Sequence, residues 1–175
     1  MTHAIYPSLR GKRVLITGGG SGIGAGLVEG FVRQGARVHF VDVAVQDSEE
    51  LVASLSGAEV PPQFQRCDLT DLGAVKSTID GIVAAEGGID ILVNNAANDD
   101  RHKVEEVTPE YWDNRMAVNL RHLFFAAQAV APSMKANGGG AIVNLGSISW
   151  HLALPEITLY QTAKAAIEGM TRALA

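Results

Sequence analysis

The sequence has one cysteine, Cys67, among its 175 residues, so no internal disulfide can form. A lone cysteine also lacks the partners that a structural zinc site needs. The formal net charge is −5, and the lysines and arginines are scattered without a basic run. Such a charge gives no support for binding to nucleic acid or to a membrane surface. We therefore expect no metal, no nucleic acid and no membrane partner.

Long apolar runs are missing as well. None approaches the roughly 18 residues that would indicate a membrane-spanning helix, and the first 13 residues, MTHAIYPSLRGKR, lack the apolar centre of a signal peptide. Together with the single thiol, these absences predict a soluble protein of the reducing cytoplasm.

Hydrophobic residues make up 47% of the chain and charged residues 19%, as in ordinary globular domains. No repeat or linker divides the chain, so we expect one domain, 1–175. Short β-branched runs alternate with longer helical stretches, and Pro61-Pro62 indicates a loop. The predicted strands are 13–18, 37–42, 63–67, 89–95 and 141–145. The predicted helices are 22–34, 48–55, 71–85, one long helix from Pro109 to about 135, and a last helix starting at 155–157. Apolar strands separated by helices predict an α/β fold, a doubly wound parallel sheet of Rossmann type.

A glycine-rich turn, TGGGSGIG, joins the first strand to its helix. The amino end of a helix presents unpaired amides and a positive dipole, which suit a pyrophosphate. Bulk at Gly18, Gly22 or Gly24 would obstruct the turn or the approach of the phosphates. Asp42 ends the second strand 18 residues after Gly24, near the spacing at which an acid binds the ribose 2′-hydroxyl of NAD. A carboxylate there repels a 2′-phosphate, so NAD is expected over NADP; the alternative is that Asp42 only caps the following loop.

Tyr160 and Lys164, in the stretch YQTAK, share one face of the last helix. A free tyrosine has a pKa of about 10 and is a poor base at neutral pH. A neighbouring ammonium and a positively charged nicotinamide favour the phenolate and lower that pKa. The pair therefore fits a general base that takes a hydroxyl proton while hydride leaves the adjoining carbon.

The glycine turn, NNAA at 94–97 and YQTAK occur in one chain in this order, and with them the sequence resembles the short-chain dehydrogenase/reductase family. Ala97 departs mildly, since most members have glycine there. The resemblance implies a homo-oligomer, dimer or tetramer. It implies that Asp68 and Leu69 hold the adenine, that Asn95 and Ala96 line the cofactor cleft, and that Asn119 supports a water in a proton relay. It gives Ser147, 13 residues before Tyr160, the role of orienting the reacting oxygen. The implied cofactor-binding set is Gly18, Ser21, Gly22, Ile23, Gly24, Asp42, Asp68, Leu69, Asn95, Ala96, Tyr160 and Lys164, and the catalytic set is Asn119, Ser147, Tyr160 and Lys164. For Asn119, a buried helical asparagine bonded to backbone is the alternative.

Two polar stretches follow strands at the edge where such sheets bind ligands, NDDRHK at 98–103 and SISWH at 147–151. We expect their side chains to crowd toward one cleft and to suit a polyhydroxylated substrate. These stretches, with IYPSL and VNLRH, resemble the NAD-dependent sugar 1-dehydrogenases within the family. That resemblance implies oxidation of the C1 hydroxyl of an aldose, D-xylose to D-xylonolactone, with Asn98, Ser147, Trp150, His151 and Tyr160 contacting the sugar. The alternative for 99–103 is a solvated charged loop.

The family's fold continues past its catalytic helix with about two more strands and a lid over the substrate. By that comparison this chain lacks the C-terminal strands and the lid, and its fifth strand is left as an open edge. Three hypotheses stay open: a sugar dehydrogenase or another secondary-alcohol dehydrogenase of which this is a part, a natural short NAD-binding module without turnover, and a regulatory subunit.

Overall fold

The computed structural model describes residues 4–175; of the predicted domain, residues 1–3 lie outside the described part. The strands are β1 Arg13–Thr17, β2 Arg37–Asp42, β3 Gln63–Arg66, β4 Ile91–Asn94 and β5 Ala141–Asn144. The α-helices are α1 Gly22–Arg33, α2 Val45–Ser54, α3 Leu72–Glu86, α4 Pro109–Met116, α5 His122–Ala136 and α6 Thr158–Leu174. Short 3-10 turns lie at Pro7–Leu9, Val104–Glu106 and Ile148–His151, and a π-helical turn at Ala117–Arg121.

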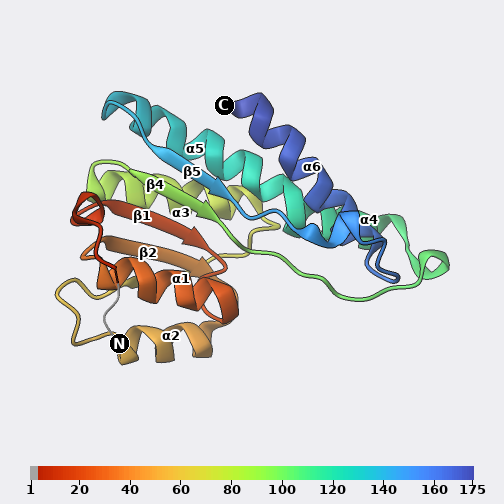
Figure 1. Ribbon diagram of the computed structural model, residues 1–175, viewed down its shortest axis with the longest axis horizontal. Helices are drawn as coiled ribbons and strands as arrows, with labels where there is room; N and C mark the ends of the chain where they lie inside the picture. The colour runs from red at the N-terminus through yellow and green to blue at the C-terminus, as the bar shows by residue number, and fades with distance from the viewer. Residues whose placement is uncertain (1–3) are drawn as a thin grey trace.

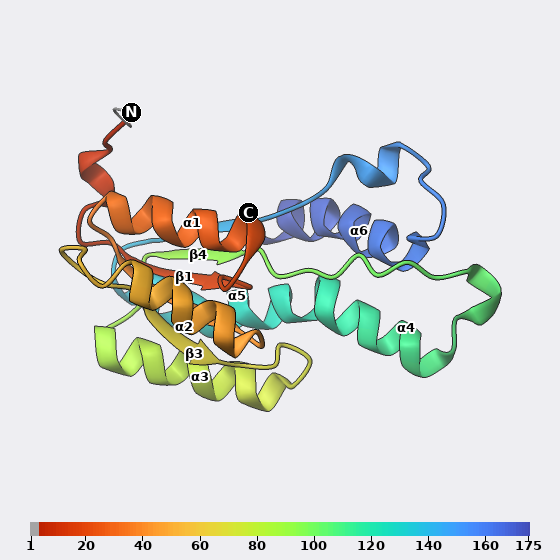
Figure 2. The same ribbon diagram turned by 90° about the horizontal axis from the view of Figure 1, so that it is seen from below.

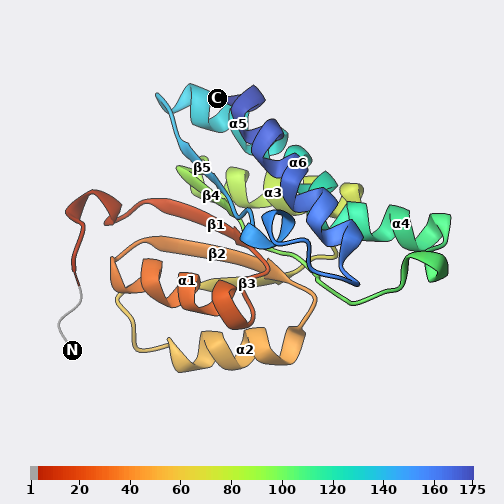
Figure 3. The same ribbon diagram turned by 45° about the vertical axis from the view of Figure 1, so that its right-hand side comes forward.

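The five strands form one parallel sheet in the order β3-β2-β1-β4-β5. Helices α1 and α2 cover one face, and α3 and α5 cover the other (Figures 1 and 3). The strand order reverses at β1: β2 and β3 lie on one side of it, and after β3 the chain crosses to the other side to form β4 and β5. The doubly wound α/β fold expected from the sequence is confirmed, and such a reversal opens a crevice at the carboxyl ends of the strands.

The central strands are apolar on both faces because both faces are covered. In β1, the side chains of Val14 and Ile16 pack against the α1 side, whereas Leu15 between them packs against α3 and α5. All three are fully buried. Alternate residues of a strand point to opposite faces, so an unbroken apolar run fills two cores at once.

The predicted element boundaries differ from the observed ones by at most three residues. Helix α2 begins at Val45, three residues before the expected start, and α6 begins at Thr158. Helical backbone runs from Pro109 to Ala136, as expected, but a π-helical turn at Ala117–Arg121 lies between α4 and α5. Gly35 follows the C-cap of α1, with φ +74 in the left-handed region that glycine tolerates.

β5 lies at one edge of the sheet, as expected, and its residues are more exposed than those of its neighbour β4. Ile142 and Val143 in it are 36% and 48% exposed, although β-branched strand residues normally pack. Beyond the carboxyl ends of the strands, the segment from the end of β4 through α4 projects away from the sheet and returns along α5 (Figure 2). This projecting part and the start of α6 form the walls around the crevice.

At the amino ends of the strands, the side chain of Arg13, the first residue of β1, binds Asp90, the residue before β4. Its guanidinium donates to both carboxylate oxygens of Asp90, each at 2.8 Å, and the pair is mostly buried. These charge-assisted bonds from Arg13 lower the pKa of Asp90 to about 2, against the opposing effect of burial. Because the folded pKa lies below the unfolded value, the stabilisation is present above about pH 4 and is lost as the pH falls toward 2.

We predict that Asp90→Asn lowers the free energy of unfolding by about 2 kcal/mol at pH 7, and that the difference narrows as the pH is lowered to 3. Urea unfolding at pH 7, 4 and 3 measures this. Asp80→Asn is the control, because Asp80 pairs with Lys76 in solvent and its loss should cost less than about 0.5 kcal/mol at every pH. A constant gap between wild type and Asp90→Asn across the range would contradict the prediction.

Candidate active site

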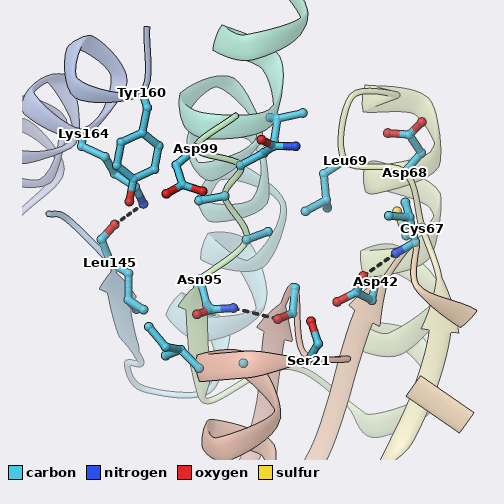
Figure 4. Close-up of a pocket in the computed structure, with 18 of the residues that line it drawn as sticks. Ser21, Asp42, Cys67, Asp68, Leu69, Asn95, Asp99, Leu145, Tyr160 and Lys164 are labelled. Carbon is cyan, nitrogen blue, oxygen red and sulfur yellow. Dashed lines mark hydrogen bonds between the residues drawn. The ribbon is translucent and has the colours of Figure 1, made fainter. Parts of the chain in front are cut away.

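A pocket of about 520 Å³ opens at the carboxyl edge of the sheet, where the strand order reverses. Its walls come from the glycine turn after β1, the ends of β2, β3, β4 and β5, and helix α6 (Figure 4). The residues that line it are Gly18, Ser21, Ile23, Gly24, Asp42, Val43, Cys67, Asp68, Leu69, Asn95, Ala96, Ala97, Asn98, Asp99, Val118, Leu145, Gly146, Tyr160 and Lys164. Eleven of the twelve predicted cofactor-binding residues lie here; Gly22 is in the turn but does not line the pocket.

The glycine turn is folded too tightly for side chains at its two ends. A Cβ at Gly24 would lie 1.8 Å from the carbonyl oxygen of Gly18, and one at Gly18 would lie 2.7 Å from the Cα of Ala96. Ser21, the residue before α1, makes no side-chain hydrogen bond to the helix amides. Glycine at these two positions therefore permits the close turn, and the first amides of α1 are left without a side-chain cap.

The amide of Asn95 ties the end of β4 to that turn. Its Nδ2 donates to the carbonyls of Thr17 and Gly18 at 3.0 and 2.7 Å. The hydroxyl of Thr17 in turn accepts from the backbone amides of Asn95 and Ala96. Asn95 and Ala96 thus hold the shape of the pocket floor, and Thr17, which the sequence did not single out, completes this arrangement.

Asp42 uses its carboxylate to hold backbone on two sides. One oxygen accepts from the amide of Gly20 at 2.8 Å, and the other accepts from the amides of Val43 and Ala44 at 2.7 and 3.0 Å. Asp42 therefore caps the loop that follows β2, which was the alternative to ribose binding. The same carboxylate also lines the pocket. These bonds fix a negative charge at the end of β2.

The far wall, after β3, carries a second carboxylate. Asp68 accepts from the hydroxyl and the amide of Thr70, at 2.7 and 2.9 Å, and these two bonds lower its pKa. Leu69 lines the pocket beside it, and Cys67 is buried there. Burial raises the pKa of the Cys67 thiol, which keeps it protonated.

Tyr160 and Lys164 enter the pocket from α6, opposite Asp42 (Figure 4). The helix is held by a buried face of Leu159, Ala163 and Ile167, which repeat every four residues. The ammonium of Lys164 lies 5.5 Å from the centre of the Tyr160 ring and donates to the carbonyl of Leu145 at 2.7 Å. Lys164 is only 3% exposed, and burial lowers its pKa.

Asn119 lies fully buried in the π-helical turn. Its side chain accepts from the amide of Asn98 at 2.8 Å and donates to the carbonyl of Asn98 at 2.9 Å. The alternative of an asparagine bonded to backbone is thus the observed geometry, across 21 residues of sequence. Through these two bonds Asn119 fixes the place of Asn98 in the pocket wall. A π-helical turn inside a helix frequently lies at a functional site.

Ser147, Trp150 and His151 line a second, shallower hollow of about 400 Å³ between β5 and α6. The hydroxyl of Ser147 donates to that of Ser149 and accepts from the Ser149 amide. The rings of Trp150 and His151 stack with their centres 3.4 Å apart. This hollow and the first pocket share Gly146 and Lys164 in their walls.

The expectation that both polar stretches crowd toward one cleft is wrong. Asn98 and Asp99 line the first pocket, whereas the stretch at 147–151 lines the second hollow. The side chain of Asp100 pairs with Arg115 at 2.9 Å, and Lys103 pairs with Glu106 in solvent, so the charged-loop alternative describes these two residues. His102 is buried away from both hollows.

His122 is a buried ionisable residue behind the pocket to which no role was assigned from sequence. It is fully buried just after the π-helical turn, and neither ring nitrogen has a hydrogen-bond partner among residues 4–175. Burial lowers its pKa to about 4, and the charge of Lys164 adds to the shift. The carbonyls of Ala117 and Val118 offset part of it without reaching hydrogen-bond geometry. The ring is therefore neutral at pH 7.

A metal cluster of three or more His, Cys, Asp or Glu side chains is not found within residues 4–175. Over the same residues, every helix is too short or too polar to cross a bilayer.

Comparison with known proteins decides the family. The profile of the family described as short chain dehydrogenase matches residues 12–175. The chain belongs to this family. It is therefore an oxidoreductase, and the resemblance seen in its motifs is confirmed.

Two relatives have names that refer to sugars. A D-xylose 1-dehydrogenase of Caulobacter vibrioides is 62% identical over 175 residues, which is the whole of this chain and 69% of the relative. A probable galactose dehydrogenase of Rhizobium meliloti is 54% identical over 173 residues, covering 97% of this chain and 67% of the relative. Among solved structures, a metagenomic short-chain oxidoreductase in complex with NADP superposes with a TM-score of 0.91 at 29% identity, covering 96% of this chain and 76% of that one. Members of the family thus bind nicotinamide cofactors.

We predict that His122→Gln flattens the pH dependence of stability. The folded pKa of about 4 lies below the unfolded value of about 6.5, so protons favour unfolding and wild-type stability falls as the pH drops from 6.5 to 4. The variant should lose less free energy of unfolding over that range, by on the order of 3 kcal/mol. Urea unfolding at pH 7, 6, 5 and 4 measures the slope. His151→Gln, at an exposed ring, should leave the slope unchanged, and parallel curves for wild type and His122→Gln would refute the assignment.

Proposed function

We propose that this protein is an NAD-dependent sugar 1-dehydrogenase that oxidises the C1 hydroxyl of D-xylose to D-xylonolactone. The observation that carries the proposal is the buried ammonium of Lys164 beside the ring of Tyr160 in a pocket that also holds the glycine turn. The 62% identity to a D-xylose 1-dehydrogenase supports the choice of sugar.

The residues present fit a dinucleotide. The glycine turn runs so close to Ala96 and to its own backbone that only glycine fits at Gly18 and Gly24, and no side chain of Ser21 caps the first amides of α1. Gly18 to Gly24 would receive the pyrophosphate, Asp42 the adenosine ribose, and Asp68 and Leu69 the adenine. Asn95 and Ala96 would border the nicotinamide half, with Lys164 close to its ribose. When bound, the oxidised nicotinamide supplies a hydride acceptor.

Tyr160 acts as the general base. Its phenolate takes the proton of the C1 hydroxyl as the C1–H bond gives up its electron pair, and the oxygen left on C1 becomes the carbonyl of the lactone. The Lys164 ammonium lies 5.5 Å from the centre of the Tyr160 ring, so a positive charge is close to the site of proton transfer. The Leu145 carbonyl holds that ammonium in place.

The sugar would lie where the pocket and the second hollow meet, at Gly146 and Lys164. From there Asn98 can reach the sugar hydroxyls from one side, while Ser147 orients the reacting oxygen from the other. The stacked rings of Trp150 and His151 offer an apolar face to the C–H groups of a pyranose. Asn119 would support proton relay by fixing Asn98.

A homo-oligomer, dimer or tetramer, is the assembly we propose. Phe124 and Phe125 on α5 are 41% and 36% exposed, with ring centres 5.4 Å apart. An exposed aromatic pair on a helix is the kind of surface that subunit contacts use.

Tyr160→Phe removes the base and keeps the ring. We predict that it lowers kcat for NADH formation from D-xylose at least about 100-fold, because general base catalysis contributes about that much, while the Kd for NAD changes less than about twofold. Absorbance of NADH and calorimetric titration of NAD measure the two quantities. Tyr6→Phe, at a tyrosine 58% exposed and outside the pocket, is the control. NADH formation by Tyr160→Phe at the wild-type rate would remove Tyr160 from the mechanism, and a wild-type rate higher on D-galactose would reassign the sugar.

Asp42→Ala tests the cofactor. Removing the carboxylate should reduce the preference for NAD over NADP at least about tenfold, since the repulsion of a 2′-phosphate disappears. Asp42→Asn removes the charge and the bond from Gly20, while its amide oxygen can still accept from Val43 and Ala44. Titrations of both cofactors against the three proteins measure the preference. An unchanged NAD to NADP ratio in both variants would count against Asp42 as the selecting residue.

A further inference from the structure

The turn that leads into α6 has an unfavourable backbone conformation. Ala153 and Glu156 have φ angles of 47 and 66, in the left-handed region that residues with a Cβ rarely adopt. Ile157, the residue before α6, makes no side-chain hydrogen bond to the helix amides. A turn of this kind keeps one conformation only when its surroundings hold it. This one leads into α6, whose third residue is Tyr160.

Arg101 and His102, in the segment between β4 and α4, hold that turn. The amide of His102 donates to the carbonyl of Glu156 at 2.8 Å. The guanidinium of Arg101 donates to the carbonyl of Pro155 at 3.2 Å. Nε2 of the His102 ring accepts from the amide of Leu159 at 3.4 Å, so the imidazole caps α6 across 57 residues of sequence.

The surroundings of the His102 ring fix which nitrogen carries the proton. The amide of Leu159 can only donate, so Nε2 must present its lone pair. Nδ1 lies 3.2 Å from the carbonyl of Asp100, which can only accept, and 3.4 Å from the hydroxyl of Tyr111. The ring is therefore neutral with its proton on Nδ1, because only that tautomer satisfies both neighbours.

Neighbouring groups hold the ring in place. His102 is 9% exposed and meets the Tyr111 ring edge-on, with centres 5.4 Å apart. Arg115 lies 5.2 Å from the centre of the Tyr111 ring and pairs with the carboxylate of Asp100 at 2.9 Å. The two residues that flank the His102 ring are thus themselves anchored.

We propose that His102 is a positioning residue: it caps α6 through Nε2, holds the strained turn before it, and so sets where Tyr160 stands in the pocket. The proposal rests on the proposed function in one respect, that Tyr160 is the base. It assigns His102 a task other than sugar contact, since the ring lines neither hollow. Displacement of a catalytic group by about 1 Å can cost about 100-fold in rate, so a cap one residue away from the base has consequences for kcat.

The tautomer is the first test. In the 15N-labelled chain at pH 7, two-bond correlations between ring protons and ring nitrogens should identify His102 as protonated on Nδ1. A proton on Nε2 would overturn the proposal, because such a ring cannot accept from Leu159.

Three substitutions form the second test. The amide oxygen of Gln can take the place of Nε2, the amide of Asn matches only Nδ1, and Phe keeps the ring with neither nitrogen. We expect kcat to fall about 10- to 100-fold in His102→Asn and His102→Phe, with the Kd for NAD unchanged within about twofold. His102→Gln should stay within about threefold of wild type. Lys103→Gln, next in the chain at an exposed ion pair, is the control and should match wild type.

Full activity of His102→Asn, or equal losses in His102→Asn and His102→Gln, would overturn the proposal. Amide hydrogen exchange keeps this result separate from the proposed function. If wild type forms no NADH from any aldose, the proposed function fails, and His102 is then judged on the Leu159 amide alone. Exchange at Leu159 should be at least about tenfold faster in His102→Asn than in wild type or His102→Gln, while the amide of Leu15 in β1 should be unaffected; equal rates at Leu159 would end the proposal.

Discussion

The hydrogen bond from the Lys164 ammonium to the Leu145 carbonyl joins the two parts of this protein on which any chemistry depends. Leu145 follows the edge strand β5, and Lys164 belongs to α6, so the bond ties the last helix to the sheet. Because a buried charge without a polar partner is costly, the ammonium stays at the carbonyl whose dipole partly compensates it. That restriction fixes the charge next to the Tyr160 ring and gives the pocket its one cationic wall residue among those described.

Hydrogen bonds between side chains and main-chain groups hold much of the rest of the site. Three polar side chains form hydrogen bonds with main-chain groups of other segments, those of Asp42, Asn95 and Asn119. Such bonds join the ends of separate strands, and they connect the loops around the pocket to one another. In the proposed enzyme, the carboxylate that selects the cofactor and the asparagine behind the sugar site are therefore structural groups as well. His102 extends the same pattern to the start of α6.

Division of the substrate side into two hollows has a simple physical origin. The stretch at 98–103 follows β4, and the stretch at 147–151 follows β5, so neighbouring strands deliver them to the same edge of the sheet. Helix α6 then crosses between them and carries Lys164 into both walls. Residues that are neighbours at a sheet edge are thus separated by an element that comes later in the chain.

The sequence by itself determined the parallel sheet, the glycine turn and the pairing of Tyr160 with Lys164, because each follows from periodicity or spacing within a short segment. It also indicated the family, since several such segments occur in order. Only the tertiary structure decided that the long helix contains a π-helical turn, that the Asn119 side chain binds Asn98, and that His102 caps α6 and does not line the pocket. The last two features depend on contacts between residues 21 and 57 positions apart, and local sequence preferences carry no information about which distant backbone group a side chain will meet.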